Sequence, residues 1–570
     1  MGRLAISFAV GIVVALLALG ALRLAPLPPG RAGPVVALLV GAATAAASAY
    51  ALLEWIPLTV ARHVQIREGS PFWETAADSG VRVVGLGTPM TFPPGDHPGC
   101  DLLCGFGVPD VQNTMGIWTL YTSGALSERN ARGSGRIVVV PGSGMITTTI
   151  YGPPDVLVEG RQTTADLRLN VGAGRVDLET NRGAARLGPG DWSDWVQVEF
   201  RMSPILSTKG MVRFRLLSIA PELAIYMTPV QFVPDDLPPG IAISSPPDYA
   251  ATLWRSGKRF ATVGWPTATN ARKDERIDVP TFRETLRQEF ESERSLTFAE
   301  LDRPDWRLLL SFFYAPDRAS HLLWADLDPT SEEDGIFETY RWMDDLVGEV
   351  RRRLGSDPGA ALFVVSDHGF QAFRKEVHLN AWLRDHGWLV LQPGAGPSAR
   401  SEQIDWSRTR AHAIGLGAIR LNLAGRAPQG IVAPEDAGET ATRLAADLLA
   451  LRDPITKEAV VRSVRRREDL YDGPRIDLAP DLQVGFEKGY RVGWTTTQGD
   501  VAAQVVTANE SPWSGDHASV DPTLVPGVFF SDRRWDAAGA GIADVGPTVL
   551  SLLGVPLLPD LDGAPLRLKE

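Results

Sequence analysis

The sequence predicts an α/β protein built on a mostly parallel sheet flanked by helices, with a β-rich insert and an N-terminal transmembrane hairpin. Three observations support this prediction. Apolar strands alternate with amphipathic helices late in the chain, residues 134–232 contain short β-rich runs, and the first 63 residues hold two uncharged apolar stretches. The 570 residues exceed what one simple core accommodates. The expected parts are a hairpin and linker at 1–63, the first α/β part at 64–133, the insert at 134–232 and the main α/β domain at 233–570.

The N-terminal hairpin is predicted from residues 4–22 and 32–53, which carry no charge. About 20 apolar residues span a bilayer, and the link between the two stretches is short and Pro-rich. A signal peptide is the alternative for the first stretch, but its apolar part is long and no clean cleavage site follows. We therefore expect anchoring in a cell membrane of bacterial type. Arginines flank the hairpin on both sides, so the orientation stays open.

Residues 70–89 predict a helix followed by a strand. Ser70 can cap the helix, Pro71 suits its first turn, and Gly80 ends it before an apolar run. This is an α/β unit. The short runs of residues 134–230 are separated by Gly, Pro and Asn, which favours an antiparallel sheet or sandwich.

The α/β pattern returns after about residue 245. Residues 307–314 and 361–366 read as apolar strands, and the segment 331–355 between them predicts a helix that Gly355 ends. Ser331 with Asp334 resembles a capping box. A strand, a long crossover and a second strand predict a parallel pair. The expected buried face of the helix consists of Ile336, Tyr340, Met343, Val347, Val350 and Leu354.

Charge and cysteine content exclude some classes of protein. The net charge of −12 argues against binding to nucleic-acid duplexes, which requires a basic surface. It leaves an anionic substrate open, because a bound metal ion can reverse the local field. The two cysteines, Cys100 and Cys104, exclude a disulfide framework and could be free thiols or one local bridge. No pattern indicates an oligomeric state.

Two acids follow predicted strands directly. Asp317 comes after strand 307–314, and Asp367 after strand 361–366. Ligands of open parallel sheets bind at the carboxyl ends of the strands, so these acids are candidates for a site. Either acid alone is more often a helix cap.

Imidazoles accompany both acids. His321 follows Asp317 by four residues, and His368 is adjacent to Asp367. His517 lies in a Gly-containing loop that could return to the same edge. Carboxylates combined with imidazoles suit zinc, manganese or iron. A lone histidine is usually not a ligand, so the joint pattern carries the prediction of a metal site.

The motifs YAPDRASHLLW, VVSDHGF, HLNAWL, WSGDH and DVGPTVLSLLG occur in this order between residues 314 and 554. They resemble the alkaline phosphatase superfamily, and within it the type I phosphodiesterase/nucleotide pyrophosphatase branch. The resemblance covers most of residues 64–570. It implies an alkaline phosphatase-like fold and two divalent metal ions, usually zinc. It also implies a membrane-anchored hydrolase of phosphate mono- or diesters.

The resemblance also implies roles for individual residues. Asp317, His321 and His517 would hold one ion, and Asp367 and His368 would help hold the other. His378 and Asn380 recur in this branch, where they position substrate or serve the structure, and Asp516 is a candidate to orient the imidazole of His517.

The opening unit of the family has no counterpart here. That unit is a strand ending in Asp-Gly, which supplies a further ligand, followed by a nucleophilic Thr or Ser, whereas the first aspartate of this chain is Asp78 in a predicted helix. Three explanations stay open: a start codon upstream of Met1, a short form that binds one metal ion and does little chemistry, or a local substitute. Thr91 is the candidate nucleophile for the last, beside Thr88 and Asp96. The chain as written is expected to bind one zinc tightly and to hydrolyse phosphodiesters slowly.

A different class of function is the alternative. The same fold could serve as a non-catalytic, membrane-anchored metal-binding or scaffolding protein. Sulfatase and phosphomutase chemistry also occur on this fold. A sulfatase requires a Cys or Ser in a modification motif, and neither Cys100 nor Cys104 lies in one.

Overall fold

The computed structural model describes residues 63–569 except 126–132, 329, 332–333, 356–358 and 560, together with positions 20, 43, 46 and 47. Apart from those four positions, the predicted hairpin at 4–22 and 32–53 lies outside the described residues. Among the residues that are described, no helix is both long and apolar enough to cross a bilayer.

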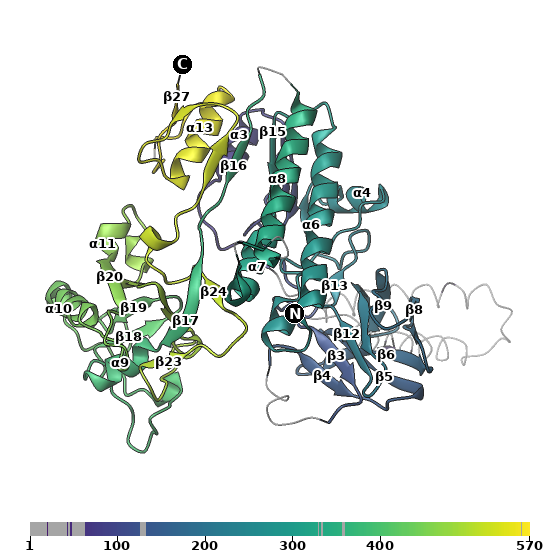
Figure 1. Ribbon diagram of the computed structural model, residues 1–570, viewed down its shortest axis with the longest axis horizontal. Helices are drawn as coiled ribbons and strands as arrows, with labels where there is room; N and C mark the ends of the chain where they lie inside the picture. The colour runs from purple at the N-terminus through teal and green to yellow at the C-terminus, as the bar shows by residue number, and fades with distance from the viewer. Residues whose placement is uncertain are drawn as a thin grey trace. The chain divides into compact units, whose positions relative to one another are not determined.

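The chain divides into two compact units, and Figure 1 labels their helices and strands. Unit 1 comprises the residues up to 271 together with 288–313, and unit 2 comprises 272–287 together with 314–570. Helix α6 (Val279–Leu301) therefore contributes residues to both units. The four segment boundaries expected from the sequence remain predictions.

Unit 1 begins with the predicted α/β unit. Helix α3 (Phe72–Asp78) leads into strand β1 (Val83–Thr88), which is almost entirely buried. Strand β1 pairs in parallel with β2 (Cys100–Cys104) and β15 (Leu308–Ser311), and the short β14 (Ser244–Ser245) adds antiparallel to β2. Two of the three pairings in this sheet are parallel, whereas most pairings in unit 2 are antiparallel, so the described fold is a mixed α/β structure. Cys100 and Cys104 are free, and burial raises the pKa of both thiols to about 12.

The β-rich segment of unit 1 forms three further sheets. The prediction of antiparallel pairing holds except for β3 and β4, which pair in parallel. Strand β6 shows why the segment folds this way: its residues alternate between buried and exposed along nearly its whole length. The sheets have the orders β11-β12-β3-β4, β5-β6-β7-β8 and β13-β10-β9. Their strands are β3 (Thr119–Thr122), β4 (Arg136–Val139), β5 (Gly144–Pro154), β6 (Gln162–Val171), β7 (Val176–Glu179), β8 (Ala184–Leu187), β9 (Val196–Arg201), β10 (Ser207–Val212), β11 (Phe214–Ser218), β12 (Ala224–Met227) and β13 (Gln231–Phe232).

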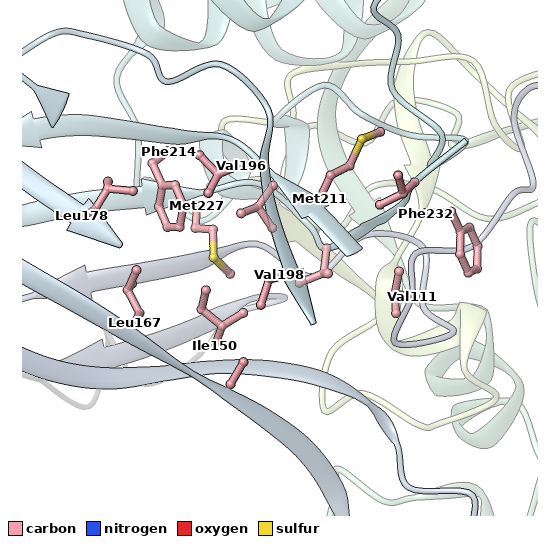
Figure 2. Packing of buried hydrophobic residues seen from close by; sticks show 14 of the residues in the cluster. Val111, Ile150, Leu167, Leu178, Val196, Val198, Met211, Phe214, Met227 and Phe232 are labelled. Carbon is pink, nitrogen blue, oxygen red and sulfur yellow. The ribbon is translucent and has the colours of Figure 1, made fainter. Parts of the chain in front are cut away.

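The inward-facing side chains of these sheets form the apolar core of unit 1. Ile150, Leu167 and Phe214 are fully buried in it. Figure 2 shows these side chains gathered with Met227 between the strands. Because alternate residues of each strand point inward, the period of two in the sequence is sufficient to build this core.

Unit 2 carries helices α7 (Ala315–Leu323) and α8 (Gly335–Leu354), followed by strands β16 (Phe363–Val365) and β17 (Gln371–Val377). Strand β17 is central, since it pairs with three other strands. These are β22 (Gly489–Val492), β23 (Val506–Ala508) and β24 (Gly515–Asp516).

Unit 2 has an apolar core of its own, which lies around the sheet with the strand order β18-β19-β21-β20. Near the C-terminus the chain forms helix α13 (Val545–Leu552), with Pro547 in its first turn. Helix α4 (Tyr249–Arg255) belongs to unit 1, and α5 (Thr269–Lys273) contributes residues to both units. The remaining elements of unit 2 are α9 (Leu379–Asp385), α10 (Ala437–Leu449), α11 (Arg467–Leu470), α12 (Trp494–Thr497), β18 (Ala411–Ile414), β19 (Ala418–Leu421), β20 (Val461–Arg466), β21 (Leu482–Phe486), β25 (Phe529–Ser531), β26 (Trp535–Asp536) and β27 (Arg567–Leu568).

The predicted parallel pair of strands 307–314 and 361–366 is not formed in the described structure. Strand β15 pairs with β1, and β16 pairs antiparallel with β25. The prediction was wrong because a long crossover permits a parallel pair without selecting the partner. Here both partners come from distant parts of the chain.

The predicted helix between these strands exists as α8, but its start and its buried face differ from expectation. Asp334 itself is the N-cap and accepts from the backbone N–H groups of Ile336 and Phe337. Tyr340, expected to face inward, is 58% exposed. Ile336 is buried as expected, and the other buried residues are Thr339, Trp342 and Leu346, which the spacing did not indicate. Burial of the large Trp342 and Leu346 rotates the helix away from the face that the apolar spacing suggested.

Candidate metal centre

Helix α7 positions the first two candidate ligands. Asp317 lies in its first turn and His321 one turn later, which brings Oδ1 of Asp317 to 3.6 Å from Nε2 of His321. The ring of His321 is buried, and its Nδ1 lies 3.0 Å from the carbonyl oxygen of Gly515. A carbonyl oxygen only accepts, so Nδ1 carries the proton and Nε2 keeps its lone pair toward Asp317.

The turn after β16 supplies the next two candidate ligands, Asp367 and His368. Nε2 of His368 lies 4.0 Å from Oδ1 of Asp317 and 3.4 Å from Oδ2 of Asp367. Nδ1 of His368 lies 3.1 Å from the carbonyl oxygen of Gly369, so again Nε2 is the nitrogen with the free lone pair. A β-carbon on Gly369 would come within 2.7 Å of the Pro526 carbonyl oxygen, which explains the glycine after the Asp-His pair.

The loop after β24 brings in His517. Strand β24 pairs with the start of β17, immediately after the turn that carries His368. This pairing places Nε2 of His517 3.6 Å from Oδ1 of Asp317. The rings of His368 and His517 stack with centroids 3.5 Å apart and planes within 9°. A β-carbon on Gly515 would lie 2.2 Å from the carbonyl oxygen of Ser320, so only glycine lets the loop approach helix α7 this closely.

The three segments thus bring together a carboxylate and two imidazoles. One ligand atom from each of Asp317, His368 and His517 lies within 4.8 Å of the other two. Within the part of the chain that the structure describes, this is the group of three or more acidic, histidine or cysteine side chains with a geometry able to hold a metal ion. One carboxylate with two imidazoles fits zinc and other first-row divalent metals, and His321 adds a further nitrogen beside Asp317.

The electrostatics of the cluster favour a cation. Burial, and then the carboxylates of Asp367 and Asp516, raise the pKa of Asp317 to about 7. Burial lowers the pKa of His321 to about 4. Burial, and then the neighbouring His368 and His321, lower the pKa of His517 to about 3. At neutral pH His321 and His517 are therefore neutral, as metal ligands must be, and a cation would relieve the repulsion between the acids.

The other residues singled out in the sequence have different surroundings. Asp367 is 74% exposed at the edge of the cluster. Asn380 is fully buried and bonds the main chain, donating to the carbonyls of Ala413 and Asp500 and accepting from the N–H of Ala413. This is a structural role.

His378 and Thr91 are also buried. Nε2 of His378 lies 3.1 Å from the Thr507 hydroxyl. The Thr91 hydroxyl, in unit 1, donates to the carbonyl oxygen of Thr88 at 2.8 Å.

Asp516 acts on the backbone of the loop rather than on the imidazole that follows it. Its Oδ1 accepts from the N–H groups of His517 and Ala518, each at 2.8 Å. Its Oδ2 accepts from the indole N–H of Trp513 at 2.9 Å and lies 2.6 Å from Nε of Arg491. Arg491 and Trp513 were not identified from the sequence. No spacing rule connects a strand arginine to a distant aspartate, and only the pairing of β22 and β24 with β17 brings them together.

Comparison with known proteins gives one match. The model of the type I phosphodiesterase / nucleotide pyrophosphatase family matches residues 241–511, which confirms the resemblance predicted from the motifs. The matched span contains Asp317, His321, Asp367 and His368 and ends shortly before His517. No curated protein and no solved structure matches significantly.

Proposed function

We propose that this chain, whose residues 241–511 belong to the type I phosphodiesterase / nucleotide pyrophosphatase family, is a metal-dependent hydrolase of phosphate mono- or diesters. The family match supports hydrolysis of a phosphate ester. The observation that carries the metal dependence is the convergence of Asp317, His368 and His517 within 4.8 Å of one another. These residues come from three separate segments, and a half-buried acid surrounded by imidazoles from distant segments is typical of a functional site.

In this proposal Asp317 and His517, with His321 beside them, hold one divalent ion, for which zinc is the best candidate. His368 lies close enough to Asp317 to share it, and His368 with the exposed Asp367 would hold a second ion more weakly. A divalent cation bound here supplies positive charge that stabilises the phosphoryl oxygens and activates an attacking oxygen.

The protein's own groups prepare this site in two ways. The main-chain carbonyls of Gly515 and Gly369 hold the Nδ1–H of His321 and His368, which directs both Nε2 lone pairs inward. The low pKa of His517 keeps that imidazole unprotonated. A cation would lower the pKa of Asp317 from about 7, so that the carboxylate is ionised when the site is loaded.

The test is a purified chain assayed for zinc content and for hydrolysis of bis(p-nitrophenyl) phosphate. We expect one tightly bound zinc and slow turnover that a chelator abolishes. His517→Ala should lose both the bound zinc and the turnover. His97→Ala is the matched control, because His97 is 25% exposed against 27% for His517 and lies in unit 1. Zinc binding without turnover would favour the non-catalytic alternative, and absence of both would refute the proposal.

We further propose that residues 4–22 and 32–53 anchor the protein in a cell membrane. Their lack of charge and their lengths support this. The expected result is that the full chain sediments with membranes and is released by detergent, whereas a chain that starts at residue 64 stays in the supernatant. Recovery of the full chain in the supernatant would contradict the anchor.

A further inference from the structure

We propose that Arg491 is a positioning residue for the metal centre, which it serves by fixing the Asp516 carboxylate that shapes the His517 loop. This inference rests on the proposed function, since it concerns the same centre. Arg491 does not reach the three clustered ligands itself. Its effect would pass through Asp516, whose two oxygens organise residues 513–518.

Arg491 is locked in place by its surroundings. It lies in β22, next to β17, and its side chain is only 4% exposed. Nε lies 2.6 Å from Oδ2 of Asp516, and Nη1 donates to the carbonyl oxygen of Val492 at 2.8 Å. The guanidinium carbon lies 3.9 Å from the ring centroid of Trp494. An ion pair, a main-chain hydrogen bond and a cation–π contact together restrict the guanidinium.

Asp516 connects the Arg491 guanidinium to the backbone of the loop that carries His517. Its side chain is 2% exposed, and its Oδ1 accepts from the N–H of His517 itself. Its Oδ2 accepts from the indole N–H of Trp513 and lies against the Arg491 guanidinium, so both oxygens of this buried carboxylate have fixed partners. The backbone from which the His517 imidazole projects is therefore held in place with the carboxylate.

The same loop also orients a second imidazole. The Gly515 carbonyl oxygen lies 3.0 Å from Nδ1 of His321, and the N–H of Ser514 donates to the His321 carbonyl oxygen at 2.8 Å. The ring of Trp513, whose indole donates to Asp516, lies 4.0 Å from the ring of His321. A displacement of Asp516 would therefore disturb both His517 and His321.

A purely structural role for the pair is the competing explanation. Buried ion pairs often contribute little to stability, and apolar replacements of both partners are commonly neutral. Charge alone also predicts an effect of the opposite sign. Removing Arg491 leaves an unpaired carboxylate near the centre, which by Coulomb attraction would tighten the binding of a cation. A weaker affinity in the variant therefore distinguishes positioning from both alternatives.

The experiment measures the zinc dissociation constant of the full chain by competition with a chromogenic chelator, together with the melting temperature with and without zinc. We expect Arg491→Met to weaken zinc binding about 10- to 100-fold, the usual loss when a group that orients a metal ligand is removed. Arg491→Lys, which keeps the cation, should recover part of it. Arg426→Met is the matched control, since Arg426 forms an ion pair with Asp481 in the same unit, away from the cluster, and should leave zinc affinity unchanged.

A double variant shows whether Arg491 acts through Asp516. Asp516→Asn should weaken zinc binding. Adding Arg491→Met to Asp516→Asn should weaken zinc binding little further, because the contact through which Arg491 acts is already lost. The double variant also keeps the test valid if Arg491→Met alone does not fold, since it leaves no unpaired buried charge.

The outcomes separate this inference from the function on which it rests. Wild-type protein that binds no zinc would refute the proposed function, and this inference with it. Wild-type protein that binds zinc, with Arg491→Met tighter than wild type or within about threefold of it, would overturn the positioning role alone. Losses from Arg491→Met and Asp516→Asn that multiply in the double variant would overturn it as well.

Discussion

The apolar core of unit 1 and the polar cluster of unit 2, which consists of Asp317, His368 and His517, differ in how their side chains are shielded from solvent. In unit 1, Ile150, Leu167 and Phe214 lose all contact with solvent and gain only non-directional packing. In unit 2, Asp317 and His517 each keep 27% of their side-chain exposure, and the pKa values of both groups depart from their ordinary range. Burial of the apolar core stabilises the fold by itself. The polar cluster stabilises the fold only when a bound ligand neutralises its charges.

One acid from each unit, Asp110 and Asp317, shows the same contrast. Asp110 in unit 1 is fully buried, but it accepts from the N–H groups of Thr114 and Ile117, in its own turn. Asp317 in unit 2 instead faces imidazoles from distant segments, His368 and His517. An acid that is satisfied by its own turn stabilises structure, and an acid that is surrounded by side chains from afar is typical of a functional site.

The largest effect is expected from breaking the apolar core. Phe214→Ala should lower the free energy of unfolding by about 4 kcal/mol, because it removes a buried ring and leaves a cavity. Denaturant unfolding measures this. Zinc affinity should not change below the unfolding transition, since the candidate ligands all belong to unit 2. Val139→Ala, at a position 54% exposed, is the control and should cost little. Loss of zinc binding in folded Phe214→Ala would show that the two regions are coupled.

Breaking the polar cluster should have the opposite signature. Asp317→Asn is expected to weaken zinc binding about 100-fold or more, equivalent to about 2.7 kcal/mol. Asp317 Oδ1 lies within 4.0 Å of the imidazoles of His321, His368 and His517, so its loss removes the oxygen that these three rings share. Asp385→Asn, at a side chain 46% exposed, is the control. An unchanged zinc affinity in Asp317→Asn would remove this carboxylate from the centre.

A packing defect in unit 2 tests whether its polar regions are as tightly built as the core of unit 1. A β-carbon on Gly493 would lie 2.3 Å from Nδ1 of His378 and 2.9 Å from Oε2 of Glu376. Gly493→Ala should therefore cost about 2 kcal/mol in unfolding free energy. Gly438→Ala is the control: Gly438 lies in helix α10, where the nearest neighbouring atom is 3.8 Å away, and alanine there should be neutral or stabilising. Equal stability of the two variants would mean that His378 is free to move.

The smallest effect is a pH dependence of the metal-free protein. The folded-state pKa of Asp317 is about 7, above the unfolded value of about 3.9, so this acid is protonated more readily in the folded state. Its contribution to stability is therefore present in acid and is lost as the pH rises through about 4 to 7. Asp317→Asn removes this loss. The melting temperature of the variant relative to wild type should increase between about pH 5 and pH 8 without metal, and excess zinc should reverse the difference. A difference that is constant with pH would contradict the raised pKa.

The sequence predicted well where the relevant contacts are local. The spacing of four between Asp317 and His321 places both on one face of a helix, and α7 has this geometry. The apolar run ending at residue 366 predicted a strand that delivers Asp367 and His368 from its end, as β16 does. The sequence offered no local rule for the expectation that the His517 loop reaches the same site. The pairing of β24 with β17 explains why it does.

Local patterns by themselves therefore determined that a helix carries Asp317 and His321 and that a strand ends before Asp367 and His368. Only the tertiary structure decided that β16 pairs with β25, that Trp342 rather than Tyr340 faces inward, and that Arg491 reaches Asp516. The physical reason is that hydrogen bonding and side-chain alternation act over a few residues. The choice of partner between distant segments depends instead on shape and charge that exist only once both segments have folded.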